Sequence, residues 1–292
     1  MFRAAYAAAI KFTKPVVLSR LAHNGACSSA IAAYVVINSD GWVVTANHVV
    51  AEIAKMDAEQ QSVVDHEAKV AAINADAALP EGKKKKAIFN LGKLNKDLTT
   101  KYSYWFGLPD NRASVKKWFT IPDIDLALGK IDPFDPAWVG TFPTFKDPTK
   151  NFEPGSSLCK LGFPFHSFEP KWDNARGQFD FPPGALPIPF FPIEGLFTRT
   201  LENPTGGGPF PLRQIETSSP GLRGQSGGPT FDTDGAIWGI QSMTINLPLG
   251  FAPKVKGMGT EHQFLNVGIG VHVETLIGAF THFGIKFQQS TH

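Results

Sequence analysis

Three features that mark particular classes of protein are scarce in this chain: cysteine, long apolar runs and charge of one sign. The two cysteines, Cys27 and Cys159, are too few for a disulfide framework. Both lie in apolar, strand-like stretches, so we expect buried free thiols, with a single bridge as the alternative. No stretch approaches the roughly 18 apolar residues of a membrane-spanning helix. The formal net charge of +2 argues against a nucleic-acid binder, which would concentrate basic residues on one face.

The composition is that of a folded globular protein. The chain has 292 residues, of which 42% are hydrophobic and 18% charged. At this length it can bury about three quarters of its unfolded surface without disulfides or metals. The lysine run at 83–86 is interpreted as a solvated loop rather than a binding patch. Residues 1–10 lack the small-residue cleavage site of a secretory signal, so a cytoplasmic location is predicted.

The pattern of apolar residues changes along the first hundred positions. Residues 15–50 alternate around a turn at 38–41, which predicts a β-hairpin with His48 just past its second strand. Residues 51–95 are rich in Ala, Glu, Lys and Gln, with apolar side chains at helical spacing. They predict one or two helices, broken near residues 80–82 by proline and glycine.

Strand patterns dominate the rest of the chain. They occur at 117–120, 125–131, 157–163, 213–217, 230–231, 236–243 and 263–273. Residues 165–213 are instead crowded with Phe and Pro, which predicts a loop without helix or interior strand. We expect this loop to pack on the body of the protein, with a partner-facing role as the alternative. Many short strands separated by turns predict an all-β barrel fold.

Three short motifs follow one another in a particular order. His48 ends Thr-Ala-Asn-His, Asp125 opens Asp-Leu-Ala-Leu, and Ser226 lies in Gly-Gln-Ser-Gly-Gly-Pro. Gly224 and the glycines after Ser226 can hold the serine in a tight turn with its hydroxyl exposed. The order His, Asp, Ser is one of three known for a serine nucleophile with a histidine base. Asp123 is the alternative carboxylate, since both aspartates would point the same way on a strand of period two.

These motifs resemble the trypsin-like serine protease superfamily, and most closely its HtrA-type bacterial branch. The resemblance implies two six-stranded antiparallel β-barrels. Trypsin-like domains usually have a much shorter connection between the histidine and the aspartate, so the helices predicted there form an insertion. Too little chain follows residue 273 for a PDZ domain, unlike most HtrA-type proteins. The expected parts are an N-terminal segment (1–14), a first barrel (15–145) with its helical insertion (51–95), a second barrel (146–283) with the Phe/Pro-rich loop (165–213), and a C-terminal tail (284–292).

The resemblance also implies the roles of the motif residues. Ser226 is the expected nucleophile, His48 the general base, and Asp125 the carboxylate that orients the imidazole. The backbone N–H groups of Gly224 and Ser226 are expected to form the oxyanion hole. Gln225 stands where trypsin has an aspartate that pairs with a newly cleaved N-terminal amine. Activation by N-terminal cleavage is therefore not expected.

Substrate contacts follow from the same resemblance. The pocket floor lies six residues before the nucleophile, at Pro220, which offers no carboxylate to a basic side chain. Ser242, Met243 and Thr244 are expected to pair with the substrate backbone, and Ser242 to support Asp125. Because Thr244 stands where large-pocket relatives have glycine, we predict a preference for small or medium aliphatic P1 side chains.

The predicted function is that of a serine endopeptidase acting on polypeptide substrates through an acyl-enzyme. No metal, organic cofactor, nucleic acid or membrane span is expected. Two alternatives stay open: a catalytically silent protease fold that binds or scaffolds, and a protease that is latent until its insertions or a partner open the site. A homo-oligomer or a regulatory partner would contact those insertions.

Overall fold

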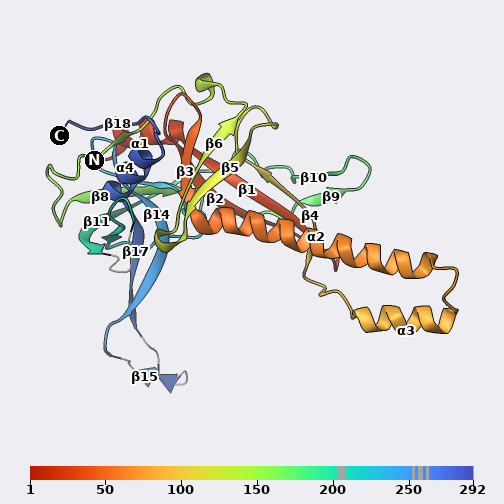
Figure 1. Cartoon of the computed structure of the whole chain (residues 1–292). Helices are drawn as coiled ribbons and strands as arrows, with labels where there is room; N and C mark the ends of the chain where they lie inside the picture. The colour runs from red at the N-terminus through yellow and green to blue at the C-terminus, as the bar shows by residue number, and fades with distance from the viewer. Residues whose placement is uncertain (203–207, 252–253, 256–258, 261–262, 292) are drawn as a thin grey trace.

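Two β-sheets form the body of the protein, and a long helical arm projects from one side of it (Figure 1). The structure, a computed structural model, describes residues 1–202, 208–251, 254–255, 259–260 and 263–291. The helices are α1 (Arg3–Phe12), α2 (Asn47–Ala75), α3 (Glu81–Leu91) and α4 (Val273–His282), with short 3₁₀ turns η1 (Pro122–Ile124) and η2 (Pro136–Trp138).

The first sheet has six antiparallel strands in the order β4-β1-β2-β3-β6-β5. They are β1 (Thr13–Ala22), β2 (Cys27–Val36), β3 (Trp42–Ala46), β4 (Thr99–Trp105), β5 (Ser114–Ile121) and β6 (Leu126–Asp132). The single hairpin predicted over 15–50 is three strands, because a second turn at 23–26 separates β1 from β2. In that turn Gly25 has a φ of +87° and the Asn24 side chain accepts from the Ala26 N–H at 2.9 Å. Strand β4 was not predicted.

Six strands of the second sheet close into a ring, because β13 pairs with both β8 and β14. Strands β7 and β18 continue the sheet beyond β14 in parallel pairing. The members are β7 (Thr144–Phe145), β8 (Ser157–Gly162), β11 (Phe191–Glu202), β12 (Arg213–Thr217), β13 (Pro229–Phe231), β14 (Ala236–Pro248), β17 (Phe264–His272) and β18 (Gln288–Gln289). Two small hairpins lie apart: β9 (Lys171–Asp173) with β10 (Gln178–Asp180), and β15 (Lys254–Val255) with β16 (Gly259–Thr260). The predicted all-β, two-barrel fold with a helical insertion is confirmed.

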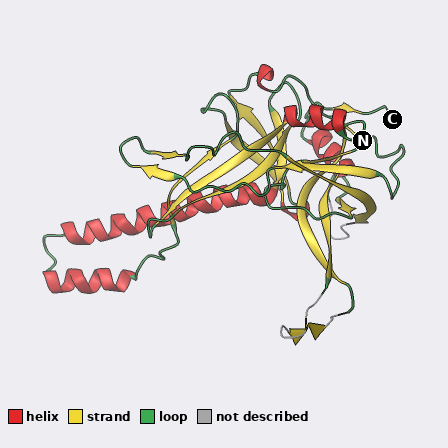
Figure 2. Cartoon of the chain, turned by 180° about the vertical axis from the view of Figure 1, so that it is seen from behind, coloured by secondary structure: helices red, strands yellow, loops and turns green. Residues whose placement is uncertain are grey.

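The helical insertion forms the arm, which Figure 2 shows from behind. Helix α2 has 29 residues and so is about 44 Å long. Its first half packs on β4, where Met56 and Val63 are buried and the Gln60 side chain donates to the Thr100 carbonyl at 2.8 Å. Past Val63 no residue of α2 is buried, and none of α3 is. The two predicted helices and their break are confirmed, but α2 begins at Asn47, earlier than expected.

The Phe/Pro-rich segment 165–213 is only partly a loop. Its strand β11 lies between β8 and β12, so the prediction that this segment contains no interior strand is wrong. The prolines lie mostly before β11, Pro192 occupies the second position of the strand, and residues 193–202 contain none. Residues 203–207 of the segment lie outside the described residues.

The part of this segment before β11 packs on the first sheet, as expected. Ile188 is buried in a cluster with Val17 of β1, and Phe181 packs against it. The rings of Phe181 and Trp105 lie 6.3 Å apart, edge to face. These partly buried aromatic side chains therefore pack between the loop and the sheet.

Both ends of the described chain pack on the body. Helix α1, which was not predicted, buries Ala5, Ala9 and Phe12. Helix α4, also not predicted, buries Leu276 and Phe280. The residues expected as an N-terminal segment and a C-terminal tail thus contribute to the core and, through β18, to the sheet.

Both cysteines are free, as expected: Cys159 is buried and Cys27 half-buried. Burial raises the pKa of the Cys159 thiol to about 11, which makes it a poor nucleophile. No helix among the described residues is long and apolar enough to cross a membrane.

Candidate active site

The three motif residues lie at ends of strands where the two sheets meet. Strand β3 pairs with β6 so that Ala46 faces Leu126 across the ladder. His48, in the first turn of α2, follows β3, and Asp125 directly precedes β6. Because the pairing brings these two strand ends together, residues 77 positions apart become neighbours. Ser226 lies in the turn between β12 and β13.

Asp125 holds His48 by two hydrogen bonds. One carboxylate oxygen accepts from the His48 backbone N–H at 2.8 Å, and the other lies 2.8 Å from the ring Nδ1. Asp125 has a φ of +56° at the end of η1. The expectation that Asp123 and Asp125 share one face of a strand is wrong, because Pro122 begins a 3₁₀ turn there. Asp123 is exposed, and it is Asp125 that faces the imidazole.

Ser242 provides a further contact, since its hydroxyl donates to the Asp125 carboxylate. Burial alone would raise the pKa of Asp125, but the hydrogen bonds from His48 and Ser242 outweigh it and lower that pKa below its ordinary value. Asp125 is therefore ionised at neutral pH. Because the Asp125 carboxylate accepts a hydrogen bond from Nδ1, a neutral His48 imidazole carries its proton on Nδ1. Its Nε2 is then free to accept a proton.

The turn that carries Ser226 packs closely against the backbone of neighbouring segments. Gly224 has a φ of +93°, and a Cβ there would lie 2.4 Å from the Phe163 carbonyl oxygen. Gly227 has a φ of +82°, and a Cβ there would lie 2.1 Å from the Ala33 oxygen. The Ala33 N–H of β2 donates to the Ser226 carbonyl at 2.8 Å. This bond ties the serine turn of the second sheet to the first sheet.

His48 and Ser226 line the same groove, a cavity of about 730 Å³ whose walls include Phe165, His166 and Arg223. The His48 ring is half exposed within it. The Ser226 hydroxyl lies 3.4 Å from the Ser242 carbonyl oxygen. Within the described residues it makes no hydrogen bond to His48. Nucleophile and base often align only when substrate binds.

The oxyanion-hole candidates are unengaged. Neither Gly224 nor Ser226 donates its backbone N–H to another group in the described part of the chain. Between them, the buried Gln225 side chain accepts from the Leu222 N–H at 2.9 Å and donates to the Phe191 carbonyl at 3.4 Å. Gln225 thus holds the turn through internal bonds, in the place where trypsin uses an aspartate.

Comparison with known proteins decides the family. A model of the trypsin-like peptidase domain matches residues 33–240, which include His48, Asp125 and Ser226. The chain belongs to the trypsin-like peptidase family. The family predicted from the three motifs is confirmed.

Solved peptidase structures are similar to this chain at low sequence identity. The HtrA-type protease AlgW with a decapeptide is 14% identical with a TM-score of 0.50, and the match covers 97% of this chain and 67% of that one. The Rv3671c protease from M. tuberculosis, in its active form, is 14% identical with a TM-score of 0.48, covering 98% and 87%. The chain spans 63–68% of the length of the AlgW structures it matches. The search of curated proteins gives no match.

Lys160 is a buried charged residue next to Pro220 that the sequence reasoning missed. It is 1% exposed in β8, and its ammonium donates to the Thr217 hydroxyl at 3.0 Å and to the carbonyls of Ser219 and Pro220, the latter at 2.8 Å. Burial lowers the pKa of Lys160 to about 7. The only signal in the sequence is a lysine inside the otherwise apolar run Leu-Cys-Lys-Leu.

The other substrate-contact candidates of the peptidase lie along β14. The Thr244 hydroxyl donates to the Gly221 carbonyl at 2.6 Å, which joins β14 to the segment expected to form the pocket floor. Met243 is 45% exposed, and its carbonyl accepts from the Gln241 side chain at 2.8 Å. Ser242 sits at a register shift in the pairing of β14 with β17, so its side chain turns toward Asp125 rather than following the ladder.

Proposed function

We propose that the protein is a serine endopeptidase with His48, Asp125 and Ser226 as its catalytic triad. The observation that carries the proposal is the 2.8 Å contact between the His48 Nδ1 and Asp125, on a histidine that shares one groove with Ser226. A histidine oriented by an ionised, half-buried carboxylate beside a partly exposed serine is the arrangement needed to activate a hydroxyl. Family membership supports the same reaction class.

In the proposed reaction, the Ser226 hydroxyl turns from the Ser242 carbonyl toward Nε2 of His48. Its oxygen attacks the scissile carbonyl carbon while Nε2 takes the hydroxyl proton. The resulting oxyanion accepts hydrogen bonds from the N–H groups of Gly224 and Ser226. His48 then gives its proton to the leaving amine as the C–N bond breaks. Water, deprotonated by the same histidine, hydrolyses the acyl-enzyme and regenerates Ser226.

The proposed specificity is for small or medium aliphatic P1 side chains. The Thr244 bond to the Gly221 carbonyl narrows the expected entrance to the pocket. The Lys160 ammonium lies near the expected floor of the P1 pocket and donates to three oxygens, including the Pro220 carbonyl. It is therefore not free to pair with an acidic P1 side chain. Thr244→Gly should widen the P1 preference of the enzyme toward Phe and Tyr in a peptide library.

Fluorophosphonate labelling tests the catalytic proposal. Wild-type protein should gain one adduct by intact mass, and Ser226→Ala none, because only an activated serine attacks the probe. Lack of labelling in folded wild-type protein would contradict the proposal and favour the silent-scaffold alternative. Labelling that appears only after a partner or peptide is added would instead identify a latent enzyme, with Ser226 still the nucleophile.

A further inference from the structure

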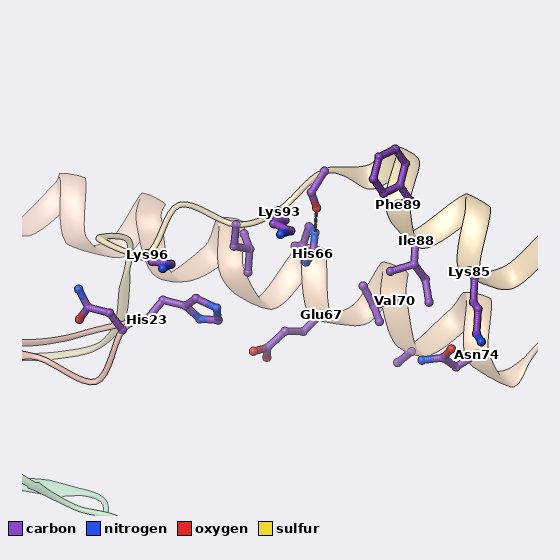
Figure 3. A pocket seen from close by; sticks show the side chains of 14 residues that line it. His23, His66, Glu67, Val70, Asn74, Lys85, Ile88, Phe89, Lys93 and Lys96 are labelled. Atoms are coloured by element: carbon purple, nitrogen blue, oxygen red, sulfur yellow. Dashed lines mark hydrogen bonds between the residues drawn. The ribbon is translucent and has the colours of Figure 1, made fainter.

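We propose that the helical arm carries a second peptide-binding site, a groove that takes an acidic segment of a partner protein bearing apolar side chains. The groove lies between α2 and α3 and extends along residues 92–96 to the turn between β1 and β2 (Figure 3). It is a cavity of about 1340 Å³. Its apolar lining consists of Val70, Ala71, Ile88, Phe89 and Leu94.

Two hydrogen bonds link the walls of the groove and fix their relative position. The His66 ring of α2 lies 3.1 Å from the Gly92 carbonyl, which anchors the segment leaving α3 (Figure 3). At the other end, the Lys84 ammonium of α3 donates to the Asn74 carbonyl at 2.8 Å. The space between the helices is therefore built in advance, which lowers the entropic cost of binding a ligand there.

Two large apolar side chains of helix α3 are exposed in the described chain. Phe89 is 81% exposed and Leu91 is 37% exposed, although both are large apolar residues. Helix α3 contains no buried residue, whereas most short helices are stabilised by packing an apolar face. An exposed apolar groove of this kind marks an interaction site.

The charge around the groove identifies the chemistry of the partner. Lys85, Lys93 and Lys96 line it, against one acidic lining residue, Glu67. Across residues 80–96 there are six lysines and one glutamate. A basic rim around an apolar floor is complementary to carboxylates flanking apolar side chains. The lysine run interpreted as a solvated loop thus forms part of a helix that borders the groove.

The shape of the site favours a peptide over an anionic membrane. Val70 and Ile88 lie between the two helices rather than on a convex tip (Figure 3). A flat bilayer would reach the lysines on the rim but not this floor, and a nucleic-acid backbone would leave the apolar lining unused.

The groove is remote from the proposed catalytic site. His48 and His66 are 18 positions apart on the same helix, which corresponds to about 27 Å. Peptide binding at the arm can therefore be measured in the Ser226→Ala variant, which cannot cleave the peptide. The result does not depend on whether the protein is an endopeptidase.

The test uses fluorescence anisotropy of a labelled 16-residue peptide with Leu or Phe at every third or fourth position and Glu between. It should bind the full-length Ser226→Ala protein at least tenfold more tightly than two reference peptides, one with Lys for Glu and one with Ser for Leu and Phe. Equal binding of the Ser-substituted peptide would overturn the proposal, because it would mean that charge alone accounts for binding.

Matched variants locate the site. The triple change Lys85→Glu, Lys93→Glu, Lys96→Glu should weaken peptide binding at least tenfold. The control Lys11→Glu, Lys130→Glu, Lys171→Glu alters three exposed lysines of the body and should leave binding unchanged. Circular dichroism checks that both variants keep their helices, and Phe89→Ser supplies a second, uncharged test. Equal weakening by both triple variants, or binding to phosphatidylserine vesicles without binding to the peptide, would refute the proposal.

Discussion

Helix α2 joins two regions of this molecule that are built in opposite ways. At its first turn, His48 is held by Asp125, which is itself held by Ser242 of the other sheet. Further along, the His66 ring contacts the Gly92 carbonyl of the arm, and no residue of α2 after Val63 is buried. The same helix thus begins in a site fixed by long-range contacts and ends in a groove fixed by local ones. Position in the tertiary structure, rather than residue type, decides what each histidine can do.

The largest expected difference between the two regions concerns their carboxylates. Asp125→Asn should lower the rate of fluorophosphonate labelling about 10⁴-fold, because an amide neither fixes the Nδ1 proton nor stabilises the imidazolium. Asp65→Asn, on the exposed far half of α2 where Asp65 accepts from Gln61, should leave the rate unchanged. Similar rates for Asp125→Asn and wild type would contradict the assignment of the triad.

Alanine substitution of one glycine in each region tests how tightly that region is packed. Gly227 and Gly92 both have a φ near +80°, but a Cβ at Gly227 would lie 2.1 Å from the Ala33 oxygen, whereas at Gly92 it would meet open space. Substitution by alanine costs about 1–2 kcal/mol from the left-handed backbone at either site. At Gly227 overpacking should add about 1–3 kcal/mol.

Urea unfolding measures this difference as the free energy of unfolding. Gly227→Ala should destabilise the protein clearly more than Gly92→Ala. If Gly92→Ala were equally destabilising, the arm would be as tightly packed as the serine turn, and the contrast between the regions would be wrong.

The smallest expected effect, taken per pH unit, is a pH dependence of stability. Since the pKa of Lys160 falls to about 7 on folding, from its usual 10.5, the unfolded chain binds a proton that the folded chain lacks between these values. Stability should therefore rise with pH over this window, by up to about 1.4 kcal/mol per pH unit. Lys160→Met should remove that slope.

The control is Lys84→Met, which removes the arm lysine that donates to a single carbonyl. Denaturation curves at pH 7, 8 and 9 should show a shallower slope for Lys160→Met than for Lys84→Met. Equal slopes would mean that Lys160 keeps its ordinary pKa inside the fold.

Local patterns in the sequence were sufficient to predict much of the fold and the family. Helical spacing and the proline at 80 predicted the two helices of the insertion, and three motifs in order predicted the family. The predictions were wrong where one pattern was applied to a whole segment. The prolines of the segment 165–213 led to a loop prediction for all of it, although residues 193–202 of β11 contain no proline. Strand β4 and helices α1 and α4 were not predicted. The alternation assumed for Asp123 and Asp125 failed because Pro122 starts a turn.

The sequence by itself determined the chemistry available: a histidine after one strand, an aspartate before another and a serine among glycines. These depend on residue identity and short spacing, which any reader of the chain can see. Only the tertiary structure decided that Ala33 of the first sheet binds the Ser226 carbonyl, that the Lys160 ammonium donates to the Pro220 carbonyl, and that α2 and α3 enclose a basic groove. Those contacts join residues tens of positions apart, and they form because strand pairing and burial, rather than local preference, set which side chains meet.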